Sequence, residues 1–359
     1  MAAARHIAIN TGGGDAPGLN AVIHAVSLAA IQRGWTVTGI RNGYLGLDEP
    51  THGLVNLDRE AVAGITHLGG TILGANNRGN PFLRVDGSGE PVDESGRVAE
   101  RFRQHGFDAL VALGGDGSLR IAERLFEHHG IPVVGVPKTI DNDVAGTELS
   151  FGFESAVAMA TEALDRLHPT AESHDRVMVV ELMGRNAGWI ALYAGVAGTA
   201  DAVLIPEIPF RIESVCEKIR DRERLGRHFS IVVVAEGAAP LEGAPVFRTS
   251  GASGGDRLGG LGRAVATEIE RLTGKDTREL VLGHLQRGGQ PVASDRLLSL
   301  RLGAAAVRAV EQEKFGTMVA LRCGDILTVP LREGAHCRTV PLDCDLVATA
   351  RDLGICLGD

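Results

Sequence analysis

A group of polar residues follows an apolar run in the stretch VGVPKTIDND, residues 134–143. The group includes Lys138, Thr139, Asp141 and Asp143, and the apolar run before it is typical of a buried strand. Ligands of an open parallel sheet bind at the carboxyl ends of its strands, so these side chains would face a crevice. One carboxylate could take a proton from an attacking hydroxyl, the other could hold Mg2+, and the lysine could neutralise phosphate charge. By itself the stretch fits phosphate chemistry and a structural Asx-rich turn equally well.

Two glycine-rich junctions earlier in the chain have a similar character. The segment TGGGDAPGLN, residues 11–20, lies between an apolar run and a helical pattern, and Gly14 would let backbone amides approach a phosphate. GGDGS lies at a second predicted strand-to-helix junction, where Asp116 could hold Mg2+ and Gly117 and Ser118 could contact a phosphate donor. Neither junction is a Walker loop or a Rossmann fingerprint. Three consecutive strand ends with phosphate-type residues are more than structural turns explain.

Basic residues that could bind phosphate occur further along the chain. Arg78 lies in a polar, glycine-rich segment, where a solvated loop arginine is the alternative interpretation. The segment DTRELVLGHLQRGG, residues 276–289, carries Arg278, His284 and Arg287. Any one of them could be a surface charge, but three in one segment of an acidic protein favour a phosphate clamp.

The composition limits the class of protein. A chain of 359 residues with 44% hydrophobic content can bury more than one core, so two lobes are expected. The net charge of -9 disfavours general binding to nucleic acid or to an acidic membrane. No apolar run is long enough to span a bilayer and no signal peptide is recognisable, which favours the cytoplasm. The five cysteines include no CxxC pair, so neither a disulfide framework nor a zinc site is indicated.

The chain resembles the 6-phosphofructokinase family over most of its length. The matching blocks are GGGDAPGLN (12–20), GGDGS (114–118), PKTIDND (137–143), SHDR (173–176), MGR (183–185), AEG (235–237), TR (277–278) and LGHLQRGG (282–289). Their combination and order are highly specific, whereas GGDG alone also occurs in lipid kinases and NAD kinases.

The resemblance implies an α/β fold with two doubly wound lobes, mainly parallel sheets, and the active site in the cleft between the lobes. Residues 1–151 plus about 286–336 would form the lobe that binds ATP and Mg2+. Residues of about 152–285 plus 337–359 would form the lobe that binds the sugar phosphate.

The resemblance also implies a role for each matched residue. Asp141 would deprotonate the sugar hydroxyl, Thr139 and Arg185 would contact the transferred phosphoryl group, and Asp143 would support them. The residues implied to bind the donor are Gly14, Gly117, Ser118, Arg78 and Lys138, with Asp116 as the ligand of Mg2+. Those implied to bind the sugar phosphate are Arg176, Met183, Gly184, Glu236, Arg278, His284 and Arg287.

The implied reaction is transfer of the γ-phosphoryl group of Mg-ATP to the 1-hydroxyl of fructose 6-phosphate, a step of glycolysis. The alternative is the same transfer from pyrophosphate. In the family, residues that match Arg176 and Arg278 enter the site from a neighbouring subunit, so a homodimer or homotetramer with shared sugar-phosphate sites is expected.

The sequence departs from well-known bacterial ATP enzymes of this family at several positions. Lys138 replaces a glycine and is shared with pyrophosphate-dependent relatives, and Asn77 before Arg78 replaces an alanine. His24 and Leu28 replace two arginines of the allosteric effector site, which puts the usual regulation by ADP and phosphoenolpyruvate in doubt. These departures suggest the mixed-substrate branch of the family.

ATP is nevertheless the predicted donor. Gly117 follows the metal ligand and leaves room for the α-phosphate of a nucleotide, where the aspartate of many pyrophosphate enzymes would fill the space. A flexible lysine at position 138 can move aside, so steric room is the stronger criterion. A kinase of lipids or NAD would leave PKTIDND and LGHLQRGG unexplained, and a catalytically inert subunit would not need Asp116, Asp141 and Arg185.

Overall fold

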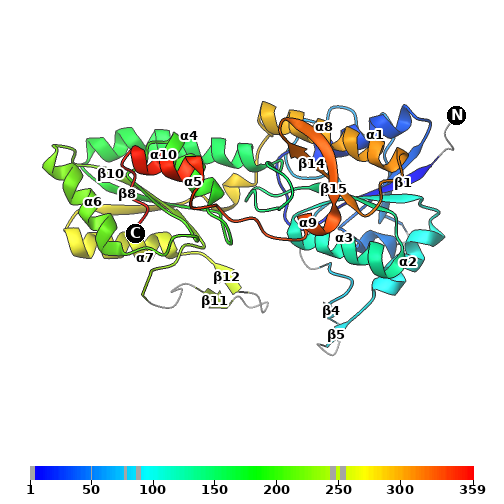
Figure 1. The fold of residues 1–359 in the computed structure, drawn as a ribbon, viewed down its shortest axis with the longest axis horizontal. Coiled ribbons are helices and arrows are strands. Elements are labelled where there is room, and N and C mark those ends of the chain that lie inside the picture. The colour runs from blue at the N-terminus through cyan, green and yellow to red at the C-terminus, as the bar shows by residue number, and fades with distance from the viewer. Residues whose placement is uncertain (1–4, 50, 77–78, 86–89, 243–247, 251–255) are drawn as a thin grey trace. The chain divides into compact units, whose positions relative to one another are not determined.

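The computed structural model describes residues 5–49, 51–76, 79–85, 90–242, 248–250 and 256–359 (Figure 1). The chain divides into two compact units. Unit 1 consists of Met1–Ser155 and Arg287–Cys337, and unit 2 consists of Ala156–Gln286 and Arg338–Asp359. Each unit has a central sheet with helices packed against it, and most strand pairs are parallel. The predicted α/β class with mainly parallel sheets is therefore confirmed.

In the described residues of unit 1, seven strands form one sheet in the order β15-β14-β7-β6-β1-β2-β3. The strands are β1 (His6–Thr11), β2 (Thr36–Ile40), β3 (Leu54–Asn56), β6 (Ala109–Gly114), β7 (Val133–Pro137), β14 (Thr317–Arg322) and β15 (Asp325–Pro330). The central strands are short apolar runs buried along their whole length, as in ALVALG of β6, because helices cover both faces. Only β3 and β15, which end the sheet, pair antiparallel to their neighbours among the strands described.

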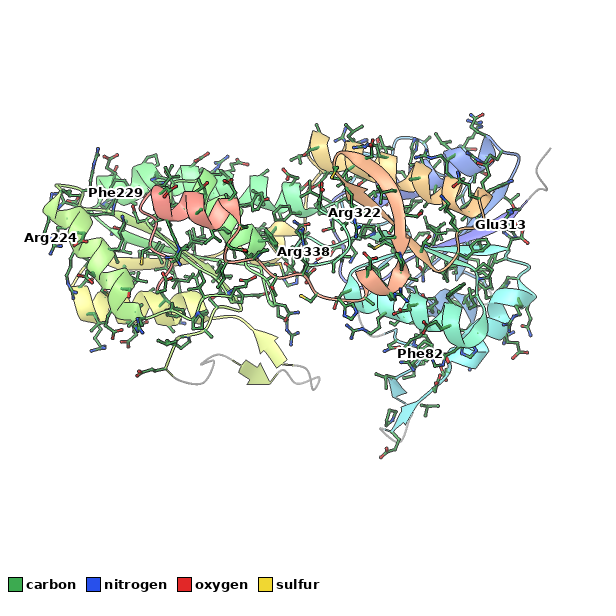
Figure 2. The ribbon with its side chains drawn as sticks, in the orientation of Figure 1. Phe82, Arg224, Phe229, Glu313, Arg322 and Arg338 are labelled. Atoms are coloured by element: carbon green, nitrogen blue, oxygen red, sulfur yellow. The ribbon has the colours of Figure 1, made fainter. Side chains whose placement is uncertain are left out.

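Helices cover the two faces of this sheet. On one face α1 (Leu19–Ile31) packs closely against α8 (Ala293–Glu311), where a Cβ on Gly303 would lie 2.8 Å from the Cβ of Ala25. The other face is covered by α2 (Ser95–Gln104), α3 (Asp116–His129) and α9 (Leu331–Gly334). There the guanidinium of Arg124 lies over the ring of Phe82, which Figure 2 labels, 3.7 Å from the ring centroid. Two separate apolar cores therefore hold the strands that carry the candidate residues.

Four parallel strands form the sheet in the described part of unit 2, in the order β13-β8-β10-β9. They are β8 (Val177–Leu182), β9 (Ala202–Leu204), β10 (Ser230–Ala235) and β13 (Thr277–Val281). The helices are α4 (Phe153–Ser173), which starts at the end of unit 1, α5 (Trp189–Ala197), α6 (Ile212–Arg224), α7 (Leu261–Thr273) and α10 (Asp345–Asp352). The remaining strands form two short hairpins, β4 (Arg84–Val85) with β5 (Pro91–Val92) and β11 (Arg248–Ser250) with β12 (Asp256–Leu258).

The end of the chain, from Arg338 onward, packs against unit 2. Cys356 pairs with Ala202 of β9, and the guanidinium of Arg338 lies over the Trp189 ring, 4.5 Å from its centroid (Figure 2). The carboxylate of Glu207 accepts the Val340 N–H at 2.8 Å. Of the helices that the structure describes, none is long and apolar enough to cross a membrane.

Candidate active site

The ends of β1, β6 and β7 bring the three predicted phosphate segments of unit 1 to one edge of the sheet. The strands are parallel neighbours in register. The Gly12 N–H donates to the Leu113 carbonyl at 2.8 Å, and the Lys138 N–H donates to the Gly114 carbonyl at 2.9 Å. Three segments therefore start side by side: the glycine loop (TGGGDAPGLN, residues 11–20), the GGDGS junction (residues 114–118) and the TIDND loop (residues 139–143).

Two cations hold the glycine loop. The ammonium of Lys138 donates to the Gly14 carbonyl, and Nη1 of Arg287 donates to the Asp15 carbonyl at 3.2 Å. Lys138 is only 3% exposed, and its burial, with the charge of Arg287 adding to it, lowers its pKa to about 8. Nearby carboxylates, Asp15 among them, oppose that shift. The lysine can therefore change its charge close to neutral pH.

Hydrogen bonds fix the TIDND loop. The Asp141 N–H donates to Oγ1 of Thr139 at 3.1 Å. Asn142 adopts the left-handed conformation at φ 52°, which asparagine tolerates better than most residues, and its Oδ1 accepts the Ser150 N–H at 3.0 Å. Oγ of Ser150 donates to the Thr139 carbonyl at 2.9 Å. Sequence reasoning missed Ser150, which lies outside the motif, and assigned no role to Asn142.

Asp116 and Asp143 are close enough for their charges to interact. Asp143 is buried, which raises its pKa; a hydrogen bond from Thr139 lowers it, and the negative charge of Asp116 raises it further. Asp116 begins α3 and is partly exposed, with Nη2 of Arg120 at 3.9 Å. A cation between the two carboxylates would relieve their repulsion.

This donor set fits Mg2+ bound together with substrate phosphates. Among the residues described, no group of three or more His, Cys, Asp or Glu side chains is placed to hold a metal by itself. Magnesium in phosphate-transferring sites needs no such cage, since one or two carboxylates, substrate phosphates and water complete its octahedron. Asp116 and Asp143 would supply the carboxylates.

Gly117 and Ser118 occupy different surroundings in the first turn of α3. The Ser118 side chain packs between Gly12 and Gly114, where Cβ atoms would collide with it. A Cβ on Gly117 would meet no heavy atom of the described residues within 4 Å. The space beside Gly117 is therefore open, while Ser118 helps to fix the two glycine segments.

In unit 2 the MGR segment (residues 183–185) follows β8, and the AEG segment (residues 235–237) begins at the end of β10. Backbone hydrogen bonds connect the two segments. The Glu236 N–H donates to the Leu182 carbonyl at 2.9 Å, and the Gly237 N–H donates to the Gly184 carbonyl at 3.1 Å. A Cβ on Gly237 would overlap the Arg185 carbonyl, so a glycine is required there. Met183, Gly184 and Arg185 therefore lie next to Glu236.

A buried glutamine connects this region to the segment after β13. Oε1 of Gln286 accepts the Met183 N–H at 3.3 Å, and its Nε2 donates to the Gly283 carbonyl at 3.2 Å. Gln286 is 1% exposed, whereas His284, in the same short helix (Gly283–Gln286), is exposed. Sequence reasoning missed Gln286, although it lies within the LGHLQRGG block.

One carboxylate holds two of the predicted arginines together. Oδ2 of Asp276 accepts a hydrogen bond from Nε of Arg176 at 2.5 Å, and its Oδ1 forms an ion pair with Nη1 of Arg278, also at 2.5 Å. The two arginines flank the pair β8 and β13 at the start of these parallel strands. Asp276 was another residue that the sequence did not single out.

The predicted residues thus fall into two sets, one in each unit. Arg287, predicted for the sugar phosphate, contacts the glycine loop of unit 1. Asn77 and Arg78 lie outside the described residues. On α1, Nδ1 of His24 is 2.8 Å from the Val62 carbonyl and Leu28 packs against the core, so both have structural contacts.

Known proteins resemble the chain over most of its length. A sequence model of the family described as Phosphofructokinase matches residues 6–310. The "ATP-dependent 6-phosphofructokinase" of Chloroflexus aggregans is 51% identical over 358 residues, 99% of this chain and 98% of the relative. The "Pyrophosphate--fructose 6-phosphate 1-phosphotransferase" of Streptomyces coelicolor is 48% identical over 339 residues, 93% of this chain and 96% of the relative.

A solved structure agrees with these relatives. Phosphofructokinase from Saccharomyces cerevisiae superposes with a TM-score of 0.78 at 32% identity and matches 98% of this chain. This chain spans 47% of the length of that yeast chain. Together with the strand-end segments of both units, these matches confirm the resemblance seen in the sequence: the chain belongs to the phosphofructokinase family.

Proposed function

We propose that the protein is an ATP-dependent 6-phosphofructokinase, which transfers the γ-phosphoryl group of Mg-ATP to the 1-hydroxyl of fructose 6-phosphate. The observation that carries this proposal is the set of Asp116, Asp141, Asp143 and Lys138 beside the glycine loop of unit 1. Metal-binding carboxylates, a base and a cation at one sheet edge are what phosphoryl transfer needs. The product would be fructose 1,6-bisphosphate, and the reaction a cytoplasmic step of glycolysis.

In this mechanism Asp141 accepts the proton of the attacking 1-hydroxyl. Phosphoryl transfer passes through a loose transition state, so proton removal comes late and an ordinary carboxylate is basic enough. Thr139 holds the Asp141 backbone, and its hydroxyl would turn from Asp143 to the phosphoryl group, while Arg185 would supply positive charge to the same group.

Asp116 and Asp143 would hold Mg2+ together with the donor phosphates. When bound, Mg2+ neutralises charge on the phosphate oxygens. The Lys138 ammonium donates to the Gly14 carbonyl and would add positive charge to the donor phosphates. Gly117 leaves open space for the rest of the donor.

The sugar phosphate is assigned to the second set of residues. Met183, Gly184 and Glu236 are held at the ends of β8 and β10, and we propose that they bind the sugar hydroxyls. His284 and Arg287 would bind the sugar phosphate, the second of them from beside the glycine loop of unit 1.

Arg176 and Arg278 would complete the sugar-phosphate site of a neighbouring subunit in a homodimer or homotetramer. Their shared contact with Asp276 supports a common role. A neighbour's sugar phosphate would replace that carboxylate or share the arginines with it, because each guanidinium has several donors.

Pyrophosphate is the second candidate donor, and Lys138 is the observation that favours it. A buried cation beside the glycine loop could compensate for the lack of a nucleoside on the donor. The open space at Gly117 favours ATP, since a larger donor can enter there. We therefore give ATP precedence.

A product assay tests the proposed reaction directly. Purified protein with Mg-ATP and fructose 6-phosphate should convert the sugar to fructose 1,6-bisphosphate, which phosphorus NMR detects as a new ester at carbon 1. Diacylglycerol and NAD serve as controls for the other kinases with a GGDG element and should remain unphosphorylated. Phosphorylation of either control, with no change in the sugar phosphate, would refute the assignment.

A further inference from the structure

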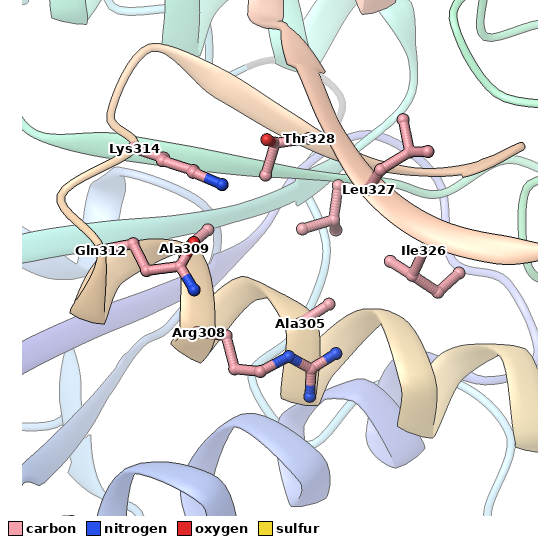
Figure 3. Close-up of a pocket in the computed structure, with 9 residues that line it drawn as sticks. Ala305, Arg308, Ala309, Gln312, Lys314, Ile326, Leu327 and Thr328 are labelled. Carbon is pink, nitrogen blue, oxygen red and sulfur yellow. The ribbon is translucent and has the colours of Figure 1, made fainter.

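A hollow in unit 1 lies between the C-terminal half of α8 and the hairpin β14–β15 (Figure 3). Its volume is about 280 Å³, close to the smaller pockets that bind organic ligands. Among the described residues, none of those lining it belongs to the candidate active site. The proposed reaction therefore gives this hollow no role.

The floor of the hollow is apolar. Ala305 and Ala309 are buried small residues on α8, and Val319 of β14 and Ile326 of β15 face them. The alanine side chains are too short to fill the space between the helix and the hairpin. This floor can accept a compact apolar or planar group without leaving a polar atom unsatisfied.

The mouth of the hollow is positively charged. Arg308 extends from α8 and Gln312 from its C-cap, and Lys314 extends from the connection to β14 toward the hairpin (Figure 3). Thr328 of β15 adds a hydroxyl. In the described part of the chain, no Asp or Glu lines the hollow, and neither cation forms an ion pair.

The acidic residues of the same segment are engaged elsewhere. Glu311 binds Arg33 at 2.8 Å, and Glu313, labelled in Figure 2, binds Arg5 at 2.7 Å. The positive charge of the mouth is therefore not cancelled by its neighbours in sequence. Although the chain has a net charge of -9, two cations without an ion pair among the described residues make the mouth locally positive above the apolar floor.

We propose that this hollow is a second ligand site, which binds a small phosphate monoester with a compact apolar or planar group. Arg308 offers a planar fork and Lys314 a point charge to the phosphate, while Gln312 and Thr328 can bond its remaining oxygens. The partial negative charge at the C-terminus of α8 repels an anion, so both cations are needed to bind the phosphate. The organic group occupies the floor formed by the two alanines.

Phenyl phosphate is a suitable probe, because it joins a phosphate to a compact planar ring. It is titrated by calorimetry into the full chain with fructose 6-phosphate and a non-hydrolysable ATP analogue present, so that the proposed active site is occupied. We expect saturable binding of one phenyl phosphate per chain in the millimolar range or tighter, and weaker binding of both inorganic phosphate and phenol. Absence of saturable binding, or equal binding of inorganic phosphate, would overturn the proposal.

Variants locate the bound probe. Arg308→Gln with Lys314→Gln should weaken the binding of phenyl phosphate by about tenfold or more, since charge-assisted contacts are lost. Ala309→Leu should weaken it by filling the floor, and Arg59→Gln, an exposed arginine elsewhere in unit 1, should leave it unchanged. Unaltered binding in the double variant would refute the site. The charge variants lie on the surface, and an unchanged Tm would show that they fold.

The outcome is independent of the proposed reaction. Arg308 and Lys314 have no place in the catalytic scheme, so the double variant should retain the turnover of the unmodified protein. Loss of turnover without loss of probe binding would contradict the separation of the two sites. A protein that binds the probe but does not phosphorylate fructose 6-phosphate would refute only the proposed function.

Discussion

Asp116, Asp141 and Asp143 differ in their surroundings, and this difference separates their roles. Asp143 is buried and its pKa is raised, so a bound cation would favour its charged form. Asp116 is partly exposed at the start of α3, where it can reach a metal that arrives with the donor. The Asp141 N–H donates to Thr139, which fixes the backbone of Asp141. A base that accepts a proton from one particular hydroxyl needs such a fixed position.

Asp141→Asn should abolish most turnover. The amide keeps the size of the side chain but cannot accept the proton, and loss of a general base typically lowers kcat about 10²–10⁴-fold. The KM for fructose 6-phosphate should change little. Initial rates measure both constants, with Asp221→Asn on the surface of α6 as a control for loss of one charge. A variant with near-normal kcat would exclude Asp141 as the base.

Lys138 should make donor use depend on pH. Burial lowers its pKa to about 8, so in the free enzyme it is charged below that pH and neutral above it. If the ammonium attracts the donor phosphates, kcat/KM for the donor should fall by about tenfold as the pH rises through about 8. This fall should be absent in Lys138→Met.

The control for this profile is Lys275→Met, because Lys275 binds Glu223 at 3.1 Å in unit 2 and has no proposed role. Its pH profile should follow that of the unmodified protein. Identical profiles for the unmodified protein and Lys138→Met would show that Lys138 does not act on the donor.

At the scale of the elements, the close approach of the β8 and β10 ends positions Arg185. A Cβ on Gly237 would overlap the Arg185 carbonyl, and backbone atoms cannot swing aside as a side chain can. Gly237→Ala should therefore lower the free energy of unfolding by about 1–3 kcal/mol and also lower kcat.

Denaturant unfolding and initial rates measure these two effects of Gly237→Ala. Gly96→Ala is the matched control, because a Cβ on this helical glycine of α2 would meet no heavy atom of the described residues within 4 Å. It should stabilise the protein by about 0.5–1 kcal/mol and leave kcat unchanged. Equal stability and turnover in both variants would mean that the β8–β10 junction tolerates the overlap.

The strand ends could be predicted from the sequence because their signals are local. An apolar run followed by glycines and acids specifies a buried parallel strand and the polar loop after it, as in β6 and β7. Contacts between distant segments have no such signal. Gln286 reaches Met183 and Asp276 reaches Arg176 only after the sheet of unit 2 has formed. The end of the chain carries no motif for the same reason, since Arg338–Asp359 belongs to unit 2 while β15 belongs to unit 1.

At the scale of the whole molecule, the proposed shared site requires more than one chain. Asp276 holds Arg176 and Arg278 at the start of β8 and β13, so one carboxylate orders both arginines. If these arginines serve a neighbour's sugar phosphate, Arg176→Ala should raise the KM for fructose 6-phosphate much more than the KM for the donor.

Mixing two inactive variants tests the sharing itself. Asp141→Ser lacks the base, and Arg278→Ala lacks the arginine that is given to the neighbour. Hybrid oligomers would contain sites with both groups intact, so some activity should return after the subunits exchange. No recovery, in subunits shown by mass spectrometry to have exchanged, would argue that each chain supplies its own arginines.

The choice of donor decides between the two names that close relatives carry, and it tests the central claim most directly. The measurement is kcat/KM of the unmodified protein for Mg-ATP and for Mg-pyrophosphate at saturating fructose 6-phosphate. We predict that ATP has the higher value, because the space beside Gly117 is open to a nucleotide, and that Gly117→Asp lowers the ATP value far more than the pyrophosphate value. Turnover with pyrophosphate and none with ATP would contradict the account.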